Sequence, residues 1–157
     1  MKVLLSIIII FFLVIFQSSL YSYLEIYDAF PNLILVLILI LSILKGYKKN
    51  LVWIIFGGFL LDVHSFDNPI GTSILGLFLI SYLAYFFSQN IFKKTSVFSI
   101  ILIGIGGTLI YRIFLILVLL IAGISFQFSF VQLISQAVYN TAVLIPFFYF
   151  LKHFSIK

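Results

Sequence analysis

The stretch that decides the fold is residues 97–122, VFSIILIGIGGTLIYRIFLILVLLIA, in which Arg112 is the only charged residue. A helix needs about 20 apolar residues to cross a bilayer core of about 30 Å, and a helix over this stretch would extend about 39 Å. Other apolar runs precede and follow this stretch along the chain. The stretch therefore predicts a transmembrane helix, and the rest of the chain has to be interpreted in the same setting.

The composition of the whole chain supports that setting. Of 157 residues, 64% are apolar and 8% are charged, with a mean hydropathy of +1.34. A soluble domain has about 45–50% apolar and about 25% charged residues. These values exclude a soluble enzyme, a disordered chain and a nucleic-acid-binding protein, although the net charge is +5. The chain has no cysteine, which excludes disulfides and thiolate metal ligands.

Five more apolar runs lie in the chain besides residues 97–122, and the six are numbered here in chain order. The second and third of the six are short for upright crossings, so they either cross with help from polar flanks and local thinning or form a hairpin that dips into the membrane. The first run is interpreted as a retained span rather than a cleaved signal sequence. The sequence predicts an all-α, polytopic six-helix bundle in one domain, residues 1–157, with spans at about 3–20, 31–44, 51–61, 69–87, 97–122 and 130–151.

The charged residues between the runs predict the topology. In a six-span arrangement all eight lysines fall on one side, and the four carboxylates fall at or toward the other. The positive-inside rule makes the lysine side cytoplasmic, with both termini inside. The lysines are Lys2, Lys45, Lys48, Lys49, Lys93, Lys94, Lys152 and Lys157, and the acids are Glu25, Asp28, Asp62 and Asp67.

The three prolines mark helix positions. Pro31 and Pro69 suit the first turns of the second and fourth helices, where a missing N–H has no cost. Pro146 lies inside the last span and should kink it unless neighbouring helices satisfy the freed carbonyl.

Arg112 lies too deep in its span to reach the membrane surface, so it needs a partner in the protein or a water-filled cavity. Asp62, Asn140 and Gln136 fall at comparable depths on other helices. Two interpretations stay open: a structural clamp between the third, fifth and sixth helices, or a polar cluster that holds a ligand, an ion or a moving helix. The clamp is favoured because an Arg–Asp pair is neutral and leaves no charge for transport.

Other motifs predict packing rather than chemistry. Gly104 with Thr108, Thr72 with Gly76, and the pair at 57–58 are small residues that let helices approach, within the chain more readily than between copies. The polar segment Asp62-Val-His64-Ser-Phe-Asp67 is expected to be an outer turn and not a metal site, because its polar positions do not share one helix face. We find no nucleophile triad or phosphate-binding loop, and expect neither catalysis nor a cofactor.

Several motifs together resemble the MreD family of bacterial rod shape-determining membrane proteins. The resemblance covers nearly the whole chain and is most specific over residues 31–71. The motifs are Pro31-Asn32-Leu33, Lys45-Gly46, Gly58-Phe-Leu-Leu-Asp62, Pro69-Ile-Gly71 and Asn140-Thr141 with Pro146.

The resemblance implies a non-catalytic protein of the inner membrane that binds the single-span protein MreC. It also implies membership of the elongation complex with MreB, RodA and a class B penicillin-binding protein, which organises peptidoglycan synthesis and cell shape. Besides lipids, these would be the partners. Pro31, Asn32, Gly58, Asp62 and Gly71 would form the structural core, with Arg112 and Asn140 as the buried clamp.

The family's bundle is also similar to the substrate-binding subunits of energy-coupling-factor vitamin transporters. This similarity supplies the alternative interpretation, a membrane subunit that captures a small molecule. In that case Asp62, Arg112, Gln136 and Asn140 would line the binding site between the helices.

Overall fold

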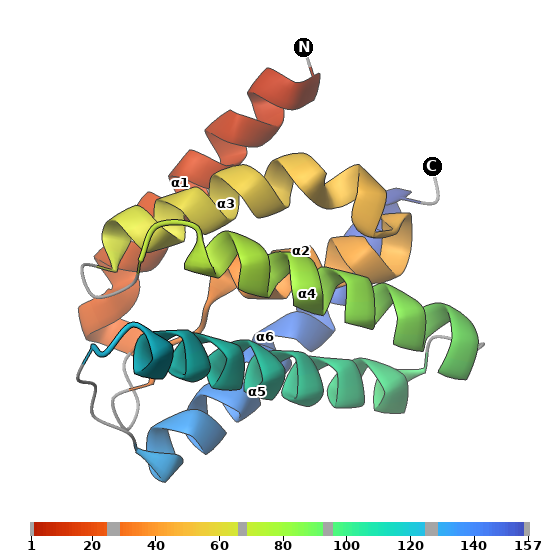
Figure 1. Ribbon diagram of the computed structural model, residues 1–157. Coiled ribbons are helices and arrows are strands. Elements are labelled where there is room, and N and C mark those ends of the chain that lie inside the picture. The colour runs from red at the N-terminus through yellow and green to blue at the C-terminus, as the bar shows by residue number, and fades with distance from the viewer. Residues whose placement is uncertain (1, 25–28, 66–68, 93–95, 125–128, 156–157) are drawn as a thin grey trace.

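The computed structural model describes residues 2–24, 29–65, 69–92, 96–124 and 129–155 of the chain. Within these ranges the regular elements are helices, which confirms the all-α prediction (Figure 1). They are α1 (Lys2–Leu24), α2 (Leu33–Lys45), the 3-10 turn η1 (Tyr47–Asn50), α3 (Leu51–His64), α4 (Thr72–Phe86), the π-helical turn η2 (Phe87–Ile91), α5 (Val97–Ile121) and α6 (Phe130–Ser155).

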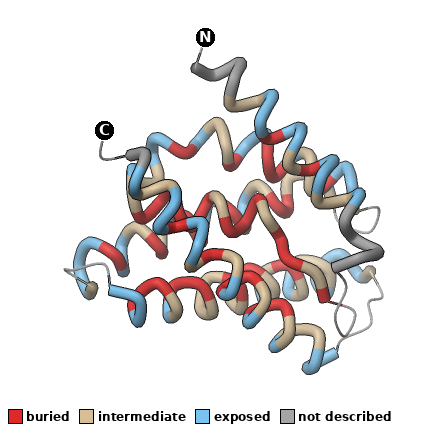
Figure 2. Tube along the Cα trace, turned by 180° about the vertical axis from the view of Figure 1, so that it is seen from behind, coloured by how far each residue is buried: buried red, intermediate tan, exposed pale blue. Residues whose placement is uncertain are grey.

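The short helix α2 lies at the centre of the bundle and contacts all five other α-helices. The others follow one another around it, with contacts between α1 and α3, α3 and α4, α4 and α5, and α5 and α6. Nearly every residue from Ile34 to Ile43 is buried. The exposed residues lie on the outward faces of the surrounding helices (Figure 2). A helix that is enclosed on all sides has apolar residues on every face, and this explains why the sequence of α2 has no polar face.

Among the described residues, three helices are long and apolar enough to cross a membrane by length and composition. They are Thr72–Ile91, Val97–Ile121 and Phe130–His153. Two shorter apolar helical stretches are Ser6–Ser19, within α1, and α2, which with 13 residues extends only about 20 Å. The structure is therefore consistent with a helical membrane bundle, while the number of crossings stays a prediction.

Two of the proline predictions are wrong in register. Pro31 precedes α2, and Asn32 is the residue that caps it. Pro69 precedes α4, where its carbonyl accepts hydrogen bonds from the backbone N–H and the hydroxyl of Thr72. Both prolines therefore lie before the first turn of their helices. The first N–H groups of α2 are capped by Asn32, and those at the start of α4 are bound by Asp62. Pro146 lies within α6, as expected.

Small residues allow the helices to approach closely. A Cβ atom on Gly58 of α3 would lie 2.7 Å from the Ile74 Cα atom of α4. A Cβ on Gly104 of α5 would lie 2.8 Å from Thr141 Oγ1 of α6. A side chain at either position would force the backbones apart. The close contacts lie within the chain, as the sequence predicted.

The described lysines gather at one end of the bundle, which we call the lysine end. Lys45 ends α2, Lys48 and Lys49 lie in η1, and Lys152 lies in the last turn of α6. Figure 1 shows the end of α2, the start of α3 and the end of α6 at this same end. Asp62 lies in the last turn of α3, at the opposite end. Lys93, Lys94, Lys157, Glu25, Asp28 and Asp67, and the side chain of Lys2, lie outside the described residues.

Candidate functional site

Buried polar groups gather where α2 and α4 begin, and we call this region the capped end. The first N–H groups of a helix have no partner within the helix, so a buried helix start must find acceptors elsewhere. At α2 these acceptors are side chains. Asn32 Oδ1 accepts from Leu35 N at 3.0 Å, and Gln17 Oε1, from α1, accepts from Leu33 N at 2.9 Å. The start of α2 is thereby tied to α1.

Asn140 extends this network to two more helices. Its Oδ1 atom accepts from the backbone N–H of Asn32 at 2.7 Å, and its Nδ2 atom donates to Thr108 Oγ1 at 3.3 Å. The Thr108 hydroxyl in turn donates to the Gly104 carbonyl within α5. Asn140 is completely buried. One side chain of α6 therefore joins the start of α2 to the middle of α5.

Asp62 accepts hydrogen bonds from the first N–H groups of α4, as Asn32 and Gln17 do for α2. Its Oδ2 atom accepts from Gly71 N at 2.7 Å, and its Oδ1 atom accepts from Ser73 N at 2.9 Å. A carboxylate is well placed at a helix N-terminus because the helix dipole is positive there. Gly71 has φ of +99°, a left-handed conformation that glycine adopts without strain. The aspartate at the end of α3 therefore fixes the start of α4.

A tyrosine of α5 joins the same cluster. Tyr111 is buried, and its hydroxyl donates to Ser73 Oγ at 3.1 Å. Ser73 thus links the Asp62 cap to the long helix α5. Around α4, as around α2, the polar contacts connect at least three helices.

The described contacts match the predicted clamp only in part. Asn140 of α6 is hydrogen-bonded to Thr108 of α5, so the expected link between the fifth and sixth helices is present. The described hydrogen bonds of Asp62 join α3 to α4 instead of to those two helices. Arg112 follows Tyr111 in α5 and is half-buried. Its pairing with Asp62 stays a prediction.

Gln136 is the exception among the polar side chains in this part of the bundle. It lies in α6 one turn before Asn140 and is 7% exposed. Within the described part of the chain, its Oε1 atom is buried without a hydrogen-bond partner. A buried acceptor without a donor costs about 1–3 kcal/mol, so this atom needs an explanation.

A second polar network, at the lysine end, was not predicted. Ser42 Oγ of α2 lies 2.6 Å from Ser81 Oγ of α4 and accepts from Asn50 Nδ2 at 3.0 Å. All three residues are buried. A single serine within an apolar run was the only available signal, and it does not reveal its partners.

The segment expected to be an outer turn is helical as far as His64, the last residue of α3, and His64 has a partner within the bundle. His64 Nε2 lies 2.8 Å from Ser18 Oγ of α1. Among the described residues, no three histidine or acidic side chains form a group that could hold a metal. Asp67, the third residue of that sequence motif, lies outside the described residues.

The described hydrogen bonds of these polar side chains join helices to one another. Four side chains accept hydrogen bonds from backbone N–H groups at helix starts. Asn32 caps its own helix, and Gln17, Asp62 and Asn140 each couple one helix to the start of another. Comparison of the chain with models of protein families, with curated proteins and with solved structures finds no match.

Proposed function

We propose that the chain is a non-catalytic membrane scaffold of the MreD type, which binds MreC within the bacterial elongation complex. In this proposal it crosses the inner membrane six times, with the lysine end and both termini in the cytoplasm. It would help to organise MreB, RodA and a class B penicillin-binding protein during peptidoglycan synthesis, without turnover of its own.

One observation carries the proposal: the residues behind the family resemblance interlock in space. Asp62 hydrogen-bonds Gly71, Gly58 contacts the start of α4 at Ile74, and Asn32 hydrogen-bonds Asn140. These residues come from four separate motifs of the sequence. A shared motif set that fixes how the helices pack supports a role in which the shape of the bundle is the functional property.

The polar groups themselves favour binding over chemistry. The hydrogen bonds described for Asp62 and Asn140 go to backbone amides and to Thr108, which are groups of the bundle itself. A catalytic carboxylate or amide would have to be available to a substrate instead. A scaffold needs only a rigid surface in the membrane.

Co-purification with MreC tests the proposal. The tagged chain is expressed with the MreC protein of the same bacterium, and a variant of MreC whose membrane span is replaced by an unrelated apolar span serves as the control. We expect MreC to be recovered with the chain and the control to be reduced. Depletion of the chain should turn rod-shaped cells round. A folded chain that recovers no MreC, or that recovers ATPase subunits, would contradict the proposal.

A single observation favours the alternative, a small-molecule-binding transport subunit. The buried Oε1 atom of Gln136, which lacks a described partner, could accept a hydrogen bond from a bound molecule. The test is mass spectrometry of small molecules released from the chain after purification from its native membrane. A vitamin-like compound at one per chain supports this alternative, and its absence together with recovered MreC supports the scaffold.

A further inference from the structure

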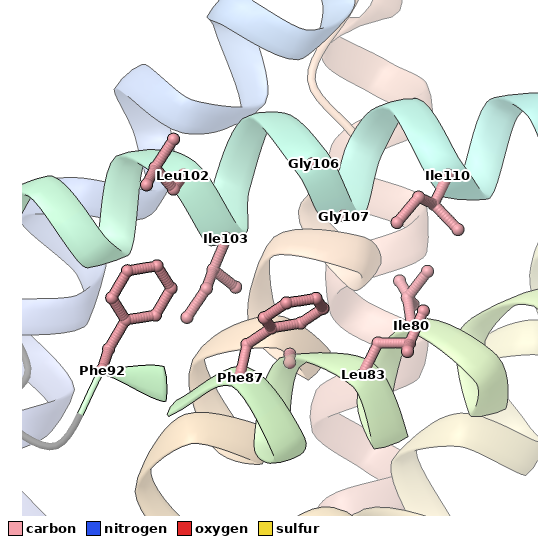
Figure 3. Close-up of a pocket in the computed structure, with 10 residues that line it drawn as sticks. Ile80, Leu83, Phe87, Phe92, Leu102, Ile103, Gly106, Gly107 and Ile110 are labelled. Carbon is pink, nitrogen blue, oxygen red and sulfur yellow. The ribbon is translucent and has the colours of Figure 1, made fainter. Parts of the chain in front are cut away.

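An apolar cleft lies between α4 and α5, in the half of the bundle toward the lysine end. Its volume is about 230 Å³, and Figure 3 shows Ile103 of α5 pointing toward the α4 side, from which the rings of Phe87 and Phe92 point toward α5. Ile80, Leu83 and Phe87 line it from the side of α4 and η2, and Leu102, Gly106 and Ile110 line it from α5. The cleft is separate from the polar contacts of the capped end.

Two adjacent glycines leave the cleft open on the α5 side, but only one of them is explained by packing within the chain. A Cβ on Gly107 would lie 2.9 Å from the Leu39 side chain of α2, so glycine is required there. A Cβ on Gly106 would meet nothing within 4 Å. Glycine inside a helix is unfavourable relative to alanine, and contacts within the described chain give no reason for it at this position.

The α4 side of the cleft is shaped by a π-helical turn. The backbone N–H of Phe92 donates to the Phe87 carbonyl, five residues back, at 2.9 Å. In Figure 3 the rings of Phe87 and Phe92 both lie on the side of the cleft toward α4. π-helical turns inside helices are rare and frequently mark functional sites. Here the turn places two aromatic rings along one apolar trough.

The rim of the cleft is open to the surroundings of the bundle. Phe87 is 37% exposed and Leu102 is 43% exposed, whereas Ile80 and Ile103 at the floor are buried. Because α4 with η2 and α5 are both candidate membrane-crossing helices, those surroundings are lipid in the setting that the composition requires. Water has no hydrogen-bond partners among such lining residues, so it would not fill the cleft.

The dimensions of the cleft select the kind of occupant. From Leu102 to Ile110 the cleft follows α5 for about 12 Å. Spread over this length, the space in the cleft forms a trough that is narrower than a helix with its side chains. An α-helix with its side chains is about 10–12 Å in diameter and is too wide. A single hydrocarbon chain, whose carbons contact neighbours at about 4 Å, fits.

The pattern of α5 also differs from that of a helix-pairing surface. Close pairing of transmembrane helices uses small residues four apart. The residues four before and four after Gly106 are Leu102 and Ile110, which are large and stand on either side of the glycine. A partner backbone could not approach Gly106 closely, whereas a thin chain could lie between the two side chains.

We propose that the α4–α5 cleft is a binding site for one acyl chain of a membrane phospholipid. The chain lies along Gly106 between Leu83 and Phe87 on one side and Leu102 and Ile110 on the other, and it completes the packing between α4 and α5. The site takes its ligand by apolar contact with the chain and not through the headgroup. It goes beyond the proposed scaffold function and does not depend on the identity of the protein partner.

Native mass spectrometry of the full chain, purified in a mild detergent, tests this site. Gly106→Leu places a side chain in the cleft from a position where the Cβ atom meets nothing within 4 Å, and Gly106→Ala changes the volume little. Ile113→Phe adds bulk to α5 at an exposed position outside the cleft. We expect about one phospholipid per chain in the unaltered protein, in Gly106→Ala and in Ile113→Phe, and at least a tenfold loss in Gly106→Leu.

A second filling variant and a crosslinking experiment keep the test decisive. If Gly106→Leu does not fold, Leu83→Trp fills the same cleft from α4 and should give the same loss of lipid. A photoreactive amino acid at position 102 should form an adduct with a phospholipid. No bound phospholipid in the unaltered protein, equal retention in a folded filling variant, or an adduct with a protein chain instead of a lipid would overturn the proposal.

Discussion

The capped end and the α4–α5 cleft join helices in opposite ways. At the capped end, Asp62, Asn32 and Asn140 provide directed hydrogen bonds to specific backbone groups. At the cleft, apolar side chains and two glycines leave a space of about 230 Å³ between two helices. In lipid the hydrophobic effect does not drive helices together, so specific contacts and close packing must do so. The capped end therefore fixes which helices associate. At the cleft, the packing between α4 and α5 is incomplete, and in our proposal a lipid chain completes it.

Replacing Asp62 should produce the largest effect on stability. Asp62→Ala leaves the N–H groups of Gly71 and Ser73 without their acceptors at the start of α4. At about 1–3 kcal/mol for each unsatisfied donor, we expect a loss of roughly 2–5 kcal/mol. Reversible unfolding of the purified chain in mixed detergent micelles measures this difference.

Asp62→Asn is the matched control for that prediction. It keeps one acceptor oxygen and the size of the side chain but loses the charge that favours a helix N-terminus, which contributes up to about 2 kcal/mol. We expect it to fall between Asp62→Ala and the unaltered chain. If both variants were as stable as the unaltered chain, Asp62 would not be the group that fixes α4.

Two glycine substitutions compare close packing with the open cleft directly. Gly58→Ala places a methyl group 2.7 Å from the Ile74 backbone, which cannot move aside as a side chain can, and should cost about 1–3 kcal/mol. Gly106→Ala meets nothing and should be neutral or stabilising by up to about 1 kcal/mol, because alanine favours the helix. The two variants, unfolded in the same micelles, should differ in sign. Equal losses would mean that position 106 is occupied by another part of the molecule.

Asn140→Ala should give a smaller effect than either large loss above. It removes the acceptor for the Asn32 N–H and the donor to Thr108. Hydrogen bonds between membrane helices contribute on average about 0.6 and at most about 1.7 kcal/mol, so we expect a loss of about 1–2 kcal/mol. Val138→Ala, at an exposed position of the same helix, is the control and should change stability by less than about 0.5 kcal/mol. A loss no larger than that of the control would remove Asn140 from the network.

The helix boundaries were largely predictable, because apolar runs and lysine clusters are properties of the sequence itself. The run 97–122 corresponds to Val97–Ile121, and 51–61 corresponds to Leu51–His64. The central position of α2 was not predicted. The length of a short apolar run does not show how many helices surround it, and the contacts of α2 with the five other α-helices give that position.

The polar site was predictable in its members but not in its contacts. Residue counting along a helix estimates depth in the membrane, so it correctly grouped Asp62 and Asn140 as buried. Depth does not give the direction in which a side chain points, so the hydrogen bonds between Asp62 and the start of α4 were not predicted. Asn32 could have been identified as a cap, because an asparagine directly before an apolar run is a helix-start signal. Gln17 could not, because its role depends on how α1 packs against α2.

Gln136 should give the smallest effect and also distinguishes the two functional proposals. Gln136→Leu removes the buried acceptor that lacks a described partner, so the stability of the empty chain should be unchanged or rise by up to about 1 kcal/mol. Under the scaffold proposal, the variant also recovers as much MreC as the unaltered chain. If the glutamine instead accepts a hydrogen bond from a bound molecule, the variant loses that molecule and the stabilisation that binding provides. Unfolding measured before and after exhaustive dialysis separates the two outcomes, since only a chain that carries a ligand becomes less stable on dialysis.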